Sequence, residues 1–384
     1  MPWFAAFFFT VYAGMNSYLF WKVRAAFPSM GRGHYALAAF LLLMIVGPVV
    51  VRMVDRAEYP RLADAMGLVA HSWLAMVFWF TCLAIVLDLW NLSAWGLSHW
   101  AGGAGRLRVG PRAFLAVAGA IVSAMAAWSF LEARNIRLTT LTVRSSKLPP
   151  GAKPIRIVQI TDMHLGGGTG DGRLEKVLRL IDEAKPDLLV STGDLVDSPY
   201  ENIKGYAAEL ARVKPPLGKY CIPGNHEYYT GMGEANRFNE AAGFAFLVNK
   251  SVKAAEGLWI AGADDPAGNR DSNLRHWVPP DPLPAPPKDA SGFVLLLKHR
   301  PAVQDSSLGQ FDLQLSGHTH DGQIFPFTLV IAMLHKYDRG HYLLDKGSEL
   351  FVSRGTGTWG PPMRLGSPPE VTLITIEPAP SPPR

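Results

Sequence analysis

Residues 155–164 read IRIVQITDMH, and they indicate how the C-terminal part of the chain folds. The first six residues are rich in isoleucine and valine, which is typical of a buried strand. Two polar residues, Asp162 and His164, follow the strand directly. In extended backbone they point to the same face because they are two residues apart. The stretch therefore predicts a strand that delivers a carboxylate and an imidazole to one place.

The same pattern occurs four more times further along the chain. Strands are predicted at 187–191, 219–222, 293–298 and 312–315, and polar side chains follow each of them directly. These side chains are Asp194 and Asp197, Asn225 and His226, His299, and His318 and His320. Ligand sites in α/β sheets lie outside the carboxyl ends of the strands, so we expect the five strand ends to meet.

Seven of these groups are typical metal ligands: Asp162, His164, Asp194, Asn225, His299, His318 and His320. Seven ligands are too many for one tetrahedral ion and suit two divalent cations that share a bridging carboxylate. The mixture of oxygen and nitrogen ligands admits Mn²⁺, Fe²⁺ or Zn²⁺. Glycines at 193, 224 and 317 precede three of the ligands and fit tight turns that bring the backbone close to the metals.

The region around these strands alternates strand-like and helical patterns. An edge strand is predicted at 136–144, an amphipathic helix at 174–184, and further strands at 245–248, 258–261, 350–353 and 371–376. This order favours a layered α/β domain with two sheets over residues 135–377. Two proline-rich stretches, 279–288 and 378–384, are interpreted as a surface loop and a disordered tail.

Residues 1–134 are predicted to form an α-helical transmembrane region. Four apolar runs contain no charged residue and are close to the ~20 residues that span a bilayer. They are Trp3–Trp21, Tyr35–Val51, Met66–Leu87 and Ala113–Leu131. Basic residues flank these runs, and residues 1–150 hold 13 Lys and Arg against 5 Asp and Glu. Buried soluble helices are the alternative, and the lack of a polar face on these runs argues against it.

Two details of the membrane region bear on function. His71 lies inside the third run, where an ionisable side chain is a candidate for function, but we favour a hydrogen-bonded structural histidine. The loops on the two sides carry six and seven basic residues, so loop charge alone does not decide the topology. The basic flank that follows the first run favours a C-terminal domain on the extracytoplasmic side of the cell membrane.

Composition excludes some classes of protein. Residues 151–384 hold 24 Lys and Arg against 27 Asp and Glu, without a basic or aromatic stripe, so we expect no nucleic-acid partner. The two cysteines, Cys82 and Cys221, cannot form a disulfide framework and are interpreted as small buried hydrophobes. The sequence does not indicate an oligomeric state.

The motifs within residues 155–376 resemble those of the calcineurin-like metallophosphoesterase superfamily. Asp162-Met-His-Leu-Gly166, Gly262-Ala-Asp-Asp265 and Gly317-His-Thr-His320 are similar to its bacterial branch with an N-terminal membrane region. The resemblance implies a two-sheet sandwich flanked by helices. By matching motif, Asp162, His164, Asp194 and His320 would hold one metal, and Asp194, Asn225, His299 and His318 the other, with Asp194 as the bridge. Two positions depart from the family pattern, namely Lys298 before His299 and Asp321 after His320.

The resemblance also implies a membrane-anchored phosphoesterase that hydrolyses phosphate ester or anhydride bonds by a hydroxide bridging two metals. His226 is expected to protonate the leaving oxygen or to stabilise its charge. Asp197 is expected to orient His226 and keep it protonated, and a helix N-cap is the alternative role for Asp197. Arg300 or Arg354 can bind a substrate phosphate or form a surface salt bridge. The membrane tether favours lipid substrates, such as phospholipids or nucleotide-linked lipids. The alternative is a non-catalytic membrane protein in which the metal-binding domain is a sensor.

Overall fold

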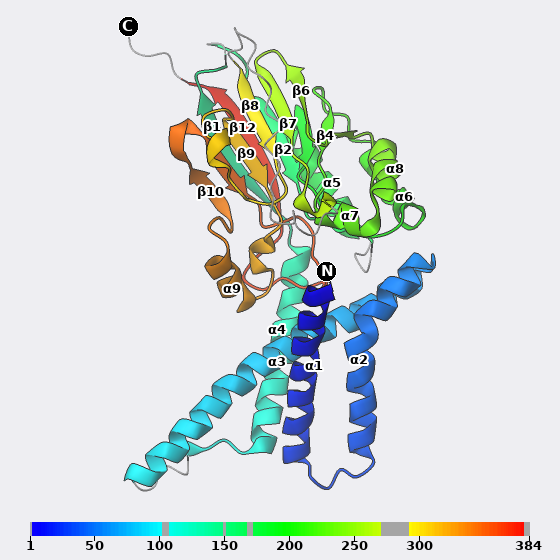
Figure 1. The fold of residues 1–384 in the computed structure, drawn as a ribbon, viewed down its shortest axis with the longest axis vertical. Helices are drawn as coiled ribbons and strands as arrows, with labels where there is room; N and C mark the ends of the chain where they lie inside the picture. The colour runs from blue at the N-terminus through cyan, green and yellow to red at the C-terminus, as the bar shows by residue number, and fades with distance from the viewer. Residues whose placement is uncertain (1, 102–106, 149–150, 167–171, 270–291, 380–384) are drawn as a thin grey trace.

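The computed structural model describes residues 2–101, 107–148, 151–166, 172–269 and 292–379. Its N-terminal region consists of four long helices, α1 (Pro2–Ala26), α2 (Gly33–Arg56), α3 (Pro60–Ala101) and α4 (Pro111–Arg134). Figure 1 shows these helices below an α/β domain, with the N-terminus on the side of that domain.

The four helices coincide with the four predicted apolar runs. Three of them, α2, α3 and α4, are long and apolar enough to cross a membrane, with mean hydropathies of 2.5, 1.9 and 2.0. Helix α1 is not among the three, and it carries a buried polar residue, Asn16, whose Oδ1 accepts a hydrogen bond from Trp73 Nε1 at 2.9 Å. A fourth span at α1 stays a prediction.

Helix α3 is longer than the predicted run at 66–87. Its 42 residues extend over about 63 Å at 1.5 Å per residue, about twice the ~30 Å hydrocarbon core of a bilayer. Asp88 lies just beyond the run, and Lys22 and Tyr18 of α1 both donate to its carboxylate. These partners let the helix continue past a charged residue. Figure 1 shows α3 running obliquely across the other helices.

The C-terminal domain contains two six-stranded sheets. The first has the order β1 (Arg137–Ser145), β12 (Glu370–Pro378), β2 (Ile155–Ile160), β3 (Leu188–Ser191), β4 (Lys219–Cys221) and β5 (Ala245–Phe246). The second has the order β10 (Gly340–Leu343), β11 (Glu349–Val352), β9 (Leu313–Ser316), β8 (Phe293–Leu297), β7 (Leu258–Gly262) and β6 (Lys250–Ala255). Strands β2, β3 and β4 are mutually parallel, as are β7, β8 and β9, so their carboxyl ends share an edge in each sheet.

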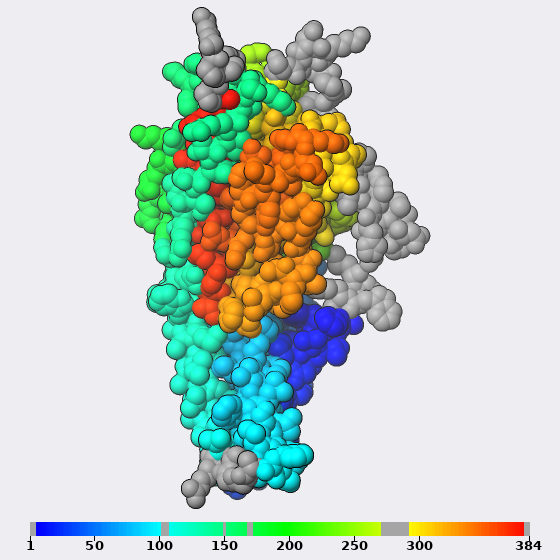
Figure 2. Space-filling model, turned by 90° about the vertical axis from the view of Figure 1, so that its left-hand side faces the viewer, coloured from blue at the N-terminus to red at the C-terminus, as the bar shows by residue number. Residues whose placement is uncertain are grey.

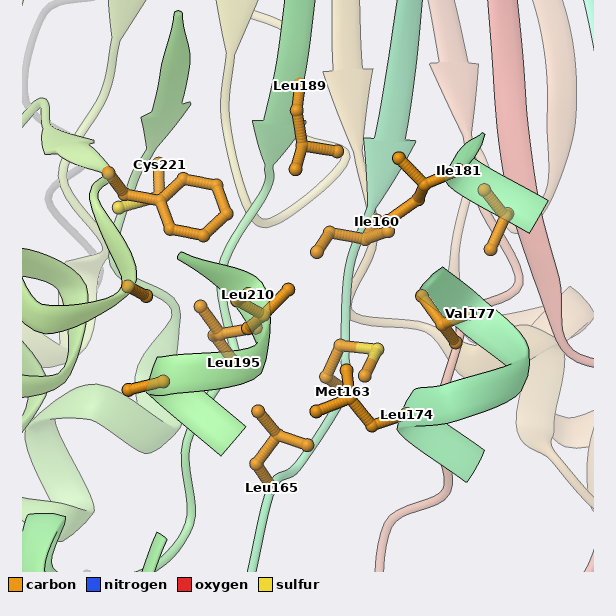
Figure 3. Close-up of a cluster of buried hydrophobic side chains, with 14 of the residues drawn as sticks. Ile160, Met163, Leu165, Leu174, Val177, Ile181, Leu189, Leu195, Leu210 and Cys221 are labelled. Atoms are coloured by element: carbon orange, nitrogen blue, oxygen red, sulfur yellow. The ribbon is translucent and has the colours of Figure 1, made fainter. Parts of the chain in front are cut away.

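Two apolar layers hold the domain together. Between the sheets pack side chains such as Ile157, Leu188, Leu295, Leu315 and Ile374. The outer face of the first sheet is covered by α5 (Gly172–Ala184), α6 (Tyr200–Leu210) and α8 (Met232–Ala242), and Figure 3 shows side chains of this layer. Each fully buried aliphatic side chain contributes about 1.5–3 kcal/mol. The predicted two-sheet domain flanked by helices is thus confirmed.

Several short elements are not marked by the sequence patterns. Helix α9 (Phe327–Leu334) is apolar at nearly every position, so no helical periodicity reveals it. Pro378, which the sequence assigns to the tail, is the last residue of β12. The predicted loop at 279–288 and residues 380–384 lie outside the described residues. Cys221 is buried as predicted, whereas Cys82 is only half-buried.

Candidate metal centre

The five predicted strand ends meet at one edge of the two sheets. Six of the seven predicted ligands, together with His226, form three overlapping groups in which the ligand atoms lie within 4.8 Å of one another. The groups are Asp162, His164 and His320; His164, Asp194 and His226; and Asp194, His299 and His318. The seventh predicted ligand, Asn225, lies beside them, since the backbone N–H of its neighbour His226 donates to Asp194 Oδ1 at 2.8 Å.

The backbone that carries these ligands is not extended. Five of the seven ligands have φ between 49° and 73°, namely Asp162, His164, Asp194, His318 and His320. Residues other than glycine rarely adopt this left-handed conformation, and such strain collects at functional sites. The predicted extended geometry after β2 is therefore wrong. Asp162 and His164 converge because the chain turns sharply at both residues.

The first group joins Asp162, His164 and His320. Nε2 of His320 lies 3.3 Å from Asp162 Oδ1 and 3.1 Å from His164 Nε2. Burial lowers the pKa of His320 to about 4, and the charge of Asp162 offsets this effect only in part. A neutral imidazole and a carboxylate are the forms that bind a metal, so this group is ready to hold a cation.

Another group joins Asp194, His299 and His318, and it shares Asp194 with the group of His164, Asp194 and His226. Oδ2 of Asp194 lies 3.2 Å from His299 Nε2 and 3.9 Å from His164 Nε2. His299 Nε2 in turn lies 3.1 Å from His318 Nδ1. Asp194 therefore stands between the histidines of the two groups, which is the position that a bridging carboxylate requires.

Asn225 provides an independent test of whether these residues fit a metal. Its side-chain Oδ1 is buried and accepts no hydrogen bond from any residue in the described part of the chain. A buried acceptor without a partner costs about 1–3 kcal/mol. A divalent cation held beside Asp194 would be such a partner. The donor set and this oxygen together fit the predicted pair of divalent ions.

Hydrogen bonds behind the ligands fix how the imidazoles are oriented. His299 Nδ1 lies 2.9 Å from the carbonyl oxygen of Thr192, to which it can only donate. His164 Nδ1 lies 3.1 Å from both carboxylate oxygens of Asp197. Because the proton is then on Nδ1, the lone pair of Nε2 points toward the other ligands, as in known metal sites.

Glu227 is a positioning residue that the sequence reasoning missed. Its Oε2 accepts from the backbone N–H groups of Gly224 (2.7 Å) and Asp194 (3.0 Å), and its Oε1 from those of Leu195 (2.7 Å) and Val196 (3.3 Å). One buried carboxylate thus ties the loop after β3 to the loop after β4. The only signal in the sequence is its place in the Gly224–Glu227 motif.

Close backbone contact at the site explains two of the predicted glycines. Gly193 has φ of +94°, and a Cβ there would lie 2.7 Å from the backbone nitrogen of Gly224. A Cβ on Gly224 would lie 2.2 Å from Asp194 Oδ1. A side chain at Gly224 would push the Asp194 carboxylate away, and one at Gly193 would clash with the backbone of Gly224 and with His299, so the close backbone approach expected at these glycines is present.

His226 and Asp197 form a pair at the edge of the metal centre. His226 Nδ1 lies 2.7 Å from Asp197 Oδ1, and Asp197 also contacts the predicted ligand His164. Burial lowers the pKa of His226, but the charges of Asp197 and Asp194 outweigh it and raise that pKa to about 9. The two carboxylates therefore favour the protonated imidazole of His226.

The two arginines considered as phosphate ligands are both paired within the domain. Arg300 donates to both carboxylate oxygens of Asp265 (2.8 and 3.1 Å), and Arg354 lies 3.3 Å from Glu370. A third arginine, Arg364, is fully buried, donates to Gly357 O at 2.6 Å and lies 3.2 Å from Nδ1 of the ligand His320. No pattern in the sequence points to Arg364.

The two positions that depart from the family pattern do not disturb the ligands. The carboxylate of Asp321 accepts a hydrogen bond from Arg339 Nη1 at 2.7 Å. The backbone N–H of the buried Lys298 continues the sheet by donating to Leu315 O at 3.1 Å.

A cavity of about 290 Å³ lies beside the metal centre, between the domain and the N-terminal helices. His164, Asp197 and His226 line it on the domain side, together with Trp359. The helices contribute Phe8, Val51, Arg52, Asp55, Leu68 and His71. His71, interpreted from the sequence as structural, therefore lines the same space as His226. Arg52 also donates to Tyr229 O at 2.9 Å, which joins α2 to the domain.

Comparison with known proteins matches residues 155–322 to the family described as calcineurin-like phosphoesterase. An uncharacterized metallophosphoesterase of Aquifex aeolicus is 41% identical over 256 residues, which cover 66% of this chain and 96% of that protein. One from Campylobacter jejuni is 33% identical, covering 63% of this chain and 65% of that protein. A transmembrane protein with metallophosphoesterase domain from Bos taurus is 29% identical over 94% of this chain and 81% of that protein.

Proposed function

The chain belongs to the calcineurin-like metallophosphoesterases, a family of metal-dependent phosphoester hydrolases, and we propose that it acts on phosphate ester or anhydride bonds of lipids. The observation that carries this proposal is the shared cavity. Its walls come from His226 and Asp197 on one side and from helices α1, α2 and α3 on the other. A substrate that fills this cavity contacts the metal centre and the membrane region at once.

We propose that Asp162, His164, Asp194 and His320 hold one metal ion, and that Asp194, Asn225, His299 and His318 hold a second. The short distances among these side chains and the buried oxygen of Asn225 support this assignment. When bound, two divalent ions (Mn²⁺, Fe²⁺ or Zn²⁺) supply Lewis-acid activation of water and neutralise charge at the phosphoryl oxygens.

His226 is proposed as the general acid. Its imidazole lines the cavity and holds a proton at neutral pH, so it can donate that proton to the oxygen of the departing group. Such proton transfer contributes about 10²–10⁴-fold to the rate. Asp197 acts through His226, because its carboxylate accepts the Nδ1 proton and leaves Nε2 to face the substrate.

The position of the domain against the bilayer supports a lipid substrate. We propose residues 1–134 as the membrane region and 135–377 as the catalytic domain. Helix α9 exposes Phe327, Leu329, Met333 and Leu334, and Phe327 packs edge-on against Phe78 of α3. Figure 2 shows the orange segment that contains α9 directly above the cyan helix α3. Exposed apolar side chains beside an apolar helix are typical of an interfacial helix, so α9 would bring the site to the lipid surface.

The side of the membrane on which the domain lies stays a prediction. The N-terminus and the domain lie on the same side of the helices in Figure 1. One measurement of the side of the domain therefore also gives the side of the N-terminus. Protease treatment of intact cells should cleave the domain if it is extracytoplasmic, as predicted, and should leave it intact if it faces the cytoplasm.

The proposed function is tested with the purified full-length protein in neutral detergent. Mn²⁺-loaded protein and chelator-treated protein are assayed on a soluble monoester, a soluble diester, a phospholipid and a nucleotide-linked diacylglycerol in mixed micelles. We expect metal-dependent hydrolysis with the highest kcat/KM on a lipid. Faster hydrolysis of the soluble esters than of either lipid contradicts the lipid assignment.

The same assay addresses the alternative function. Metal binding without hydrolysis of any of the four substrates favours a non-catalytic sensor domain.

A further inference from the structure

A second cavity, of about 600 Å³, lies where α3 and α4 meet the start of α5. Its walls combine apolar side chains such as Leu68 and Phe130 with three basic ones, Arg134, Arg173 and Lys176. One carboxylate, Asp64 of α3, is also part of the wall. The described lining therefore carries three positive charges against one negative charge.

Two of the three basic side chains, Arg173 and Lys176, are held in place by groups that do not neutralise them. Arg173 donates through Nη1 to the hydroxyl of Thr358 at 2.8 Å, and Lys176 donates through Nζ to the backbone carbonyl of Arg134 at 3.0 Å. Within the described residues, no salt bridge joins any of the three to a carboxylate. This differs from Arg300 and Arg354, which pair with Asp265 and Glu370.

Arg173 shows most clearly what it costs to leave a basic side chain without an acidic partner. Arg173 is half-buried, and this burial together with the nearby charge of Arg134 lowers its pKa to about 10. A buried charge is costly without an opposite partner. Arginine and lysine side chains gathered around one space are the usual ligands of a phosphate group.

The location of the cavity favours a lipid as the source of a phosphate. Arg134 is the last residue of α4, a helix able to cross a membrane, so the cavity lies at the level where that span ends. Lipid phosphates lie at this level, and the apolar wall of Leu68 and Phe130 can face an acyl chain.

We propose that this second cavity binds the head-group phosphate of an anionic phospholipid through Arg134, Arg173 and Lys176. The bound lipid would join α4 to α5 and thereby strengthen the contact between the membrane region and the domain. The inference does not depend on hydrolysis, although Leu68 and Pro362 line both cavities and make them neighbours.

The test compares full-length wild-type protein in neutral detergent with the double variant Arg134→Gln, Lys176→Gln. The matched control, Arg179→Gln, Arg212→Gln, removes two exposed charges from the same domain outside the cavity. Binding is measured by native mass spectrometry and by the thermal midpoint during titration with phosphatidylglycerol, phosphatidylcholine or inorganic phosphate.

We expect phosphatidylglycerol to bind the wild type and the control equally, to raise their thermal midpoints, and to bind the double variant at least tenfold more weakly. Equal affinity in the double variant overturns the proposal. Inorganic phosphate that matches phosphatidylglycerol in midpoint shift overturns the lipid assignment in favour of a soluble phosphate. If the double variant does not fold, Lys176→Gln alone is measured in the same way, and an unchanged affinity in it overturns the proposal.

Discussion

Replacing Glu227 with glutamine should loosen the metal centre without touching a proposed ligand. The carboxylate accepts four backbone N–H bonds, two at each oxygen. Glutamine keeps two acceptor sites at its oxygen, but its NH₂ group faces two N–H donors. Two buried N–H groups then lose their partner, at about 1–3 kcal/mol each, so the expected loss of stability is roughly 2–6 kcal/mol. This is a large part of the 5–15 kcal/mol that usually holds a domain folded.

The assay has two readouts on full-length protein. The thermal midpoint should fall by about 4–24 °C, since 1 kcal/mol corresponds to about 2–4 °C for a domain of this size. Metal affinity should fall about 10–100-fold, because Asp194 and the loop that carries Asn225 lose their shared support. The control is Glu240→Gln, an exposed carboxylate on α8. A Glu227→Gln protein with the midpoint and metal affinity of the wild type would refute the positioning role.

Three further variants test the roles proposed for His226, His71 and helix α9. His226→Ala should retain both metal ions by elemental analysis while kcat falls about 10²–10⁴-fold, and loss of metal would show that His226 is a ligand instead. His71→Ala should raise KM for a lipid substrate about tenfold, the equivalent of one 1.4 kcal/mol contact, while hydrolysis of a soluble ester and the exposed control His99→Ala stay unchanged. Met333→Asp with Leu334→Asp on α9 should lower the rate on vesicle-borne lipid but not on soluble substrate, and equal loss on both would argue against an interfacial helix.

The convergence of the ligands can be predicted from the sequence because it depends on strand order. Asp194 and His299 directly follow strands whose apolar composition marks them, and parallel strands bring their carboxyl ends to one edge. The side chains' final directions cannot be predicted in this way. They depend on left-handed backbone at residues such as His164 and His320, which tertiary contacts enforce against local preference.

The supporting residues could not be predicted for a related reason. Glu227 and Arg364 act through backbone groups, and a hydrogen bond to backbone leaves no mark on the partner's side-chain type. The helical wall of the cavity depends on how the two halves of the chain pack. An apolar run shows that a helix enters the membrane, but it does not show that His71 of that helix lies beside His226.

The central claim is that seven side chains hold two metal ions, and metal stoichiometry tests it most directly. Full-length protein supplied with Mn²⁺, Fe²⁺ or Zn²⁺ is desalted and analysed by mass spectrometry for metal per chain, beside Asp194→Asn and the exposed control Asp182→Asn. We predict two ions per chain in the wild type and the control, and fewer than one in Asp194→Asn, because the bridging carboxylate serves both sites. One ion or none in the wild type, or two ions in Asp194→Asn, would contradict the claim.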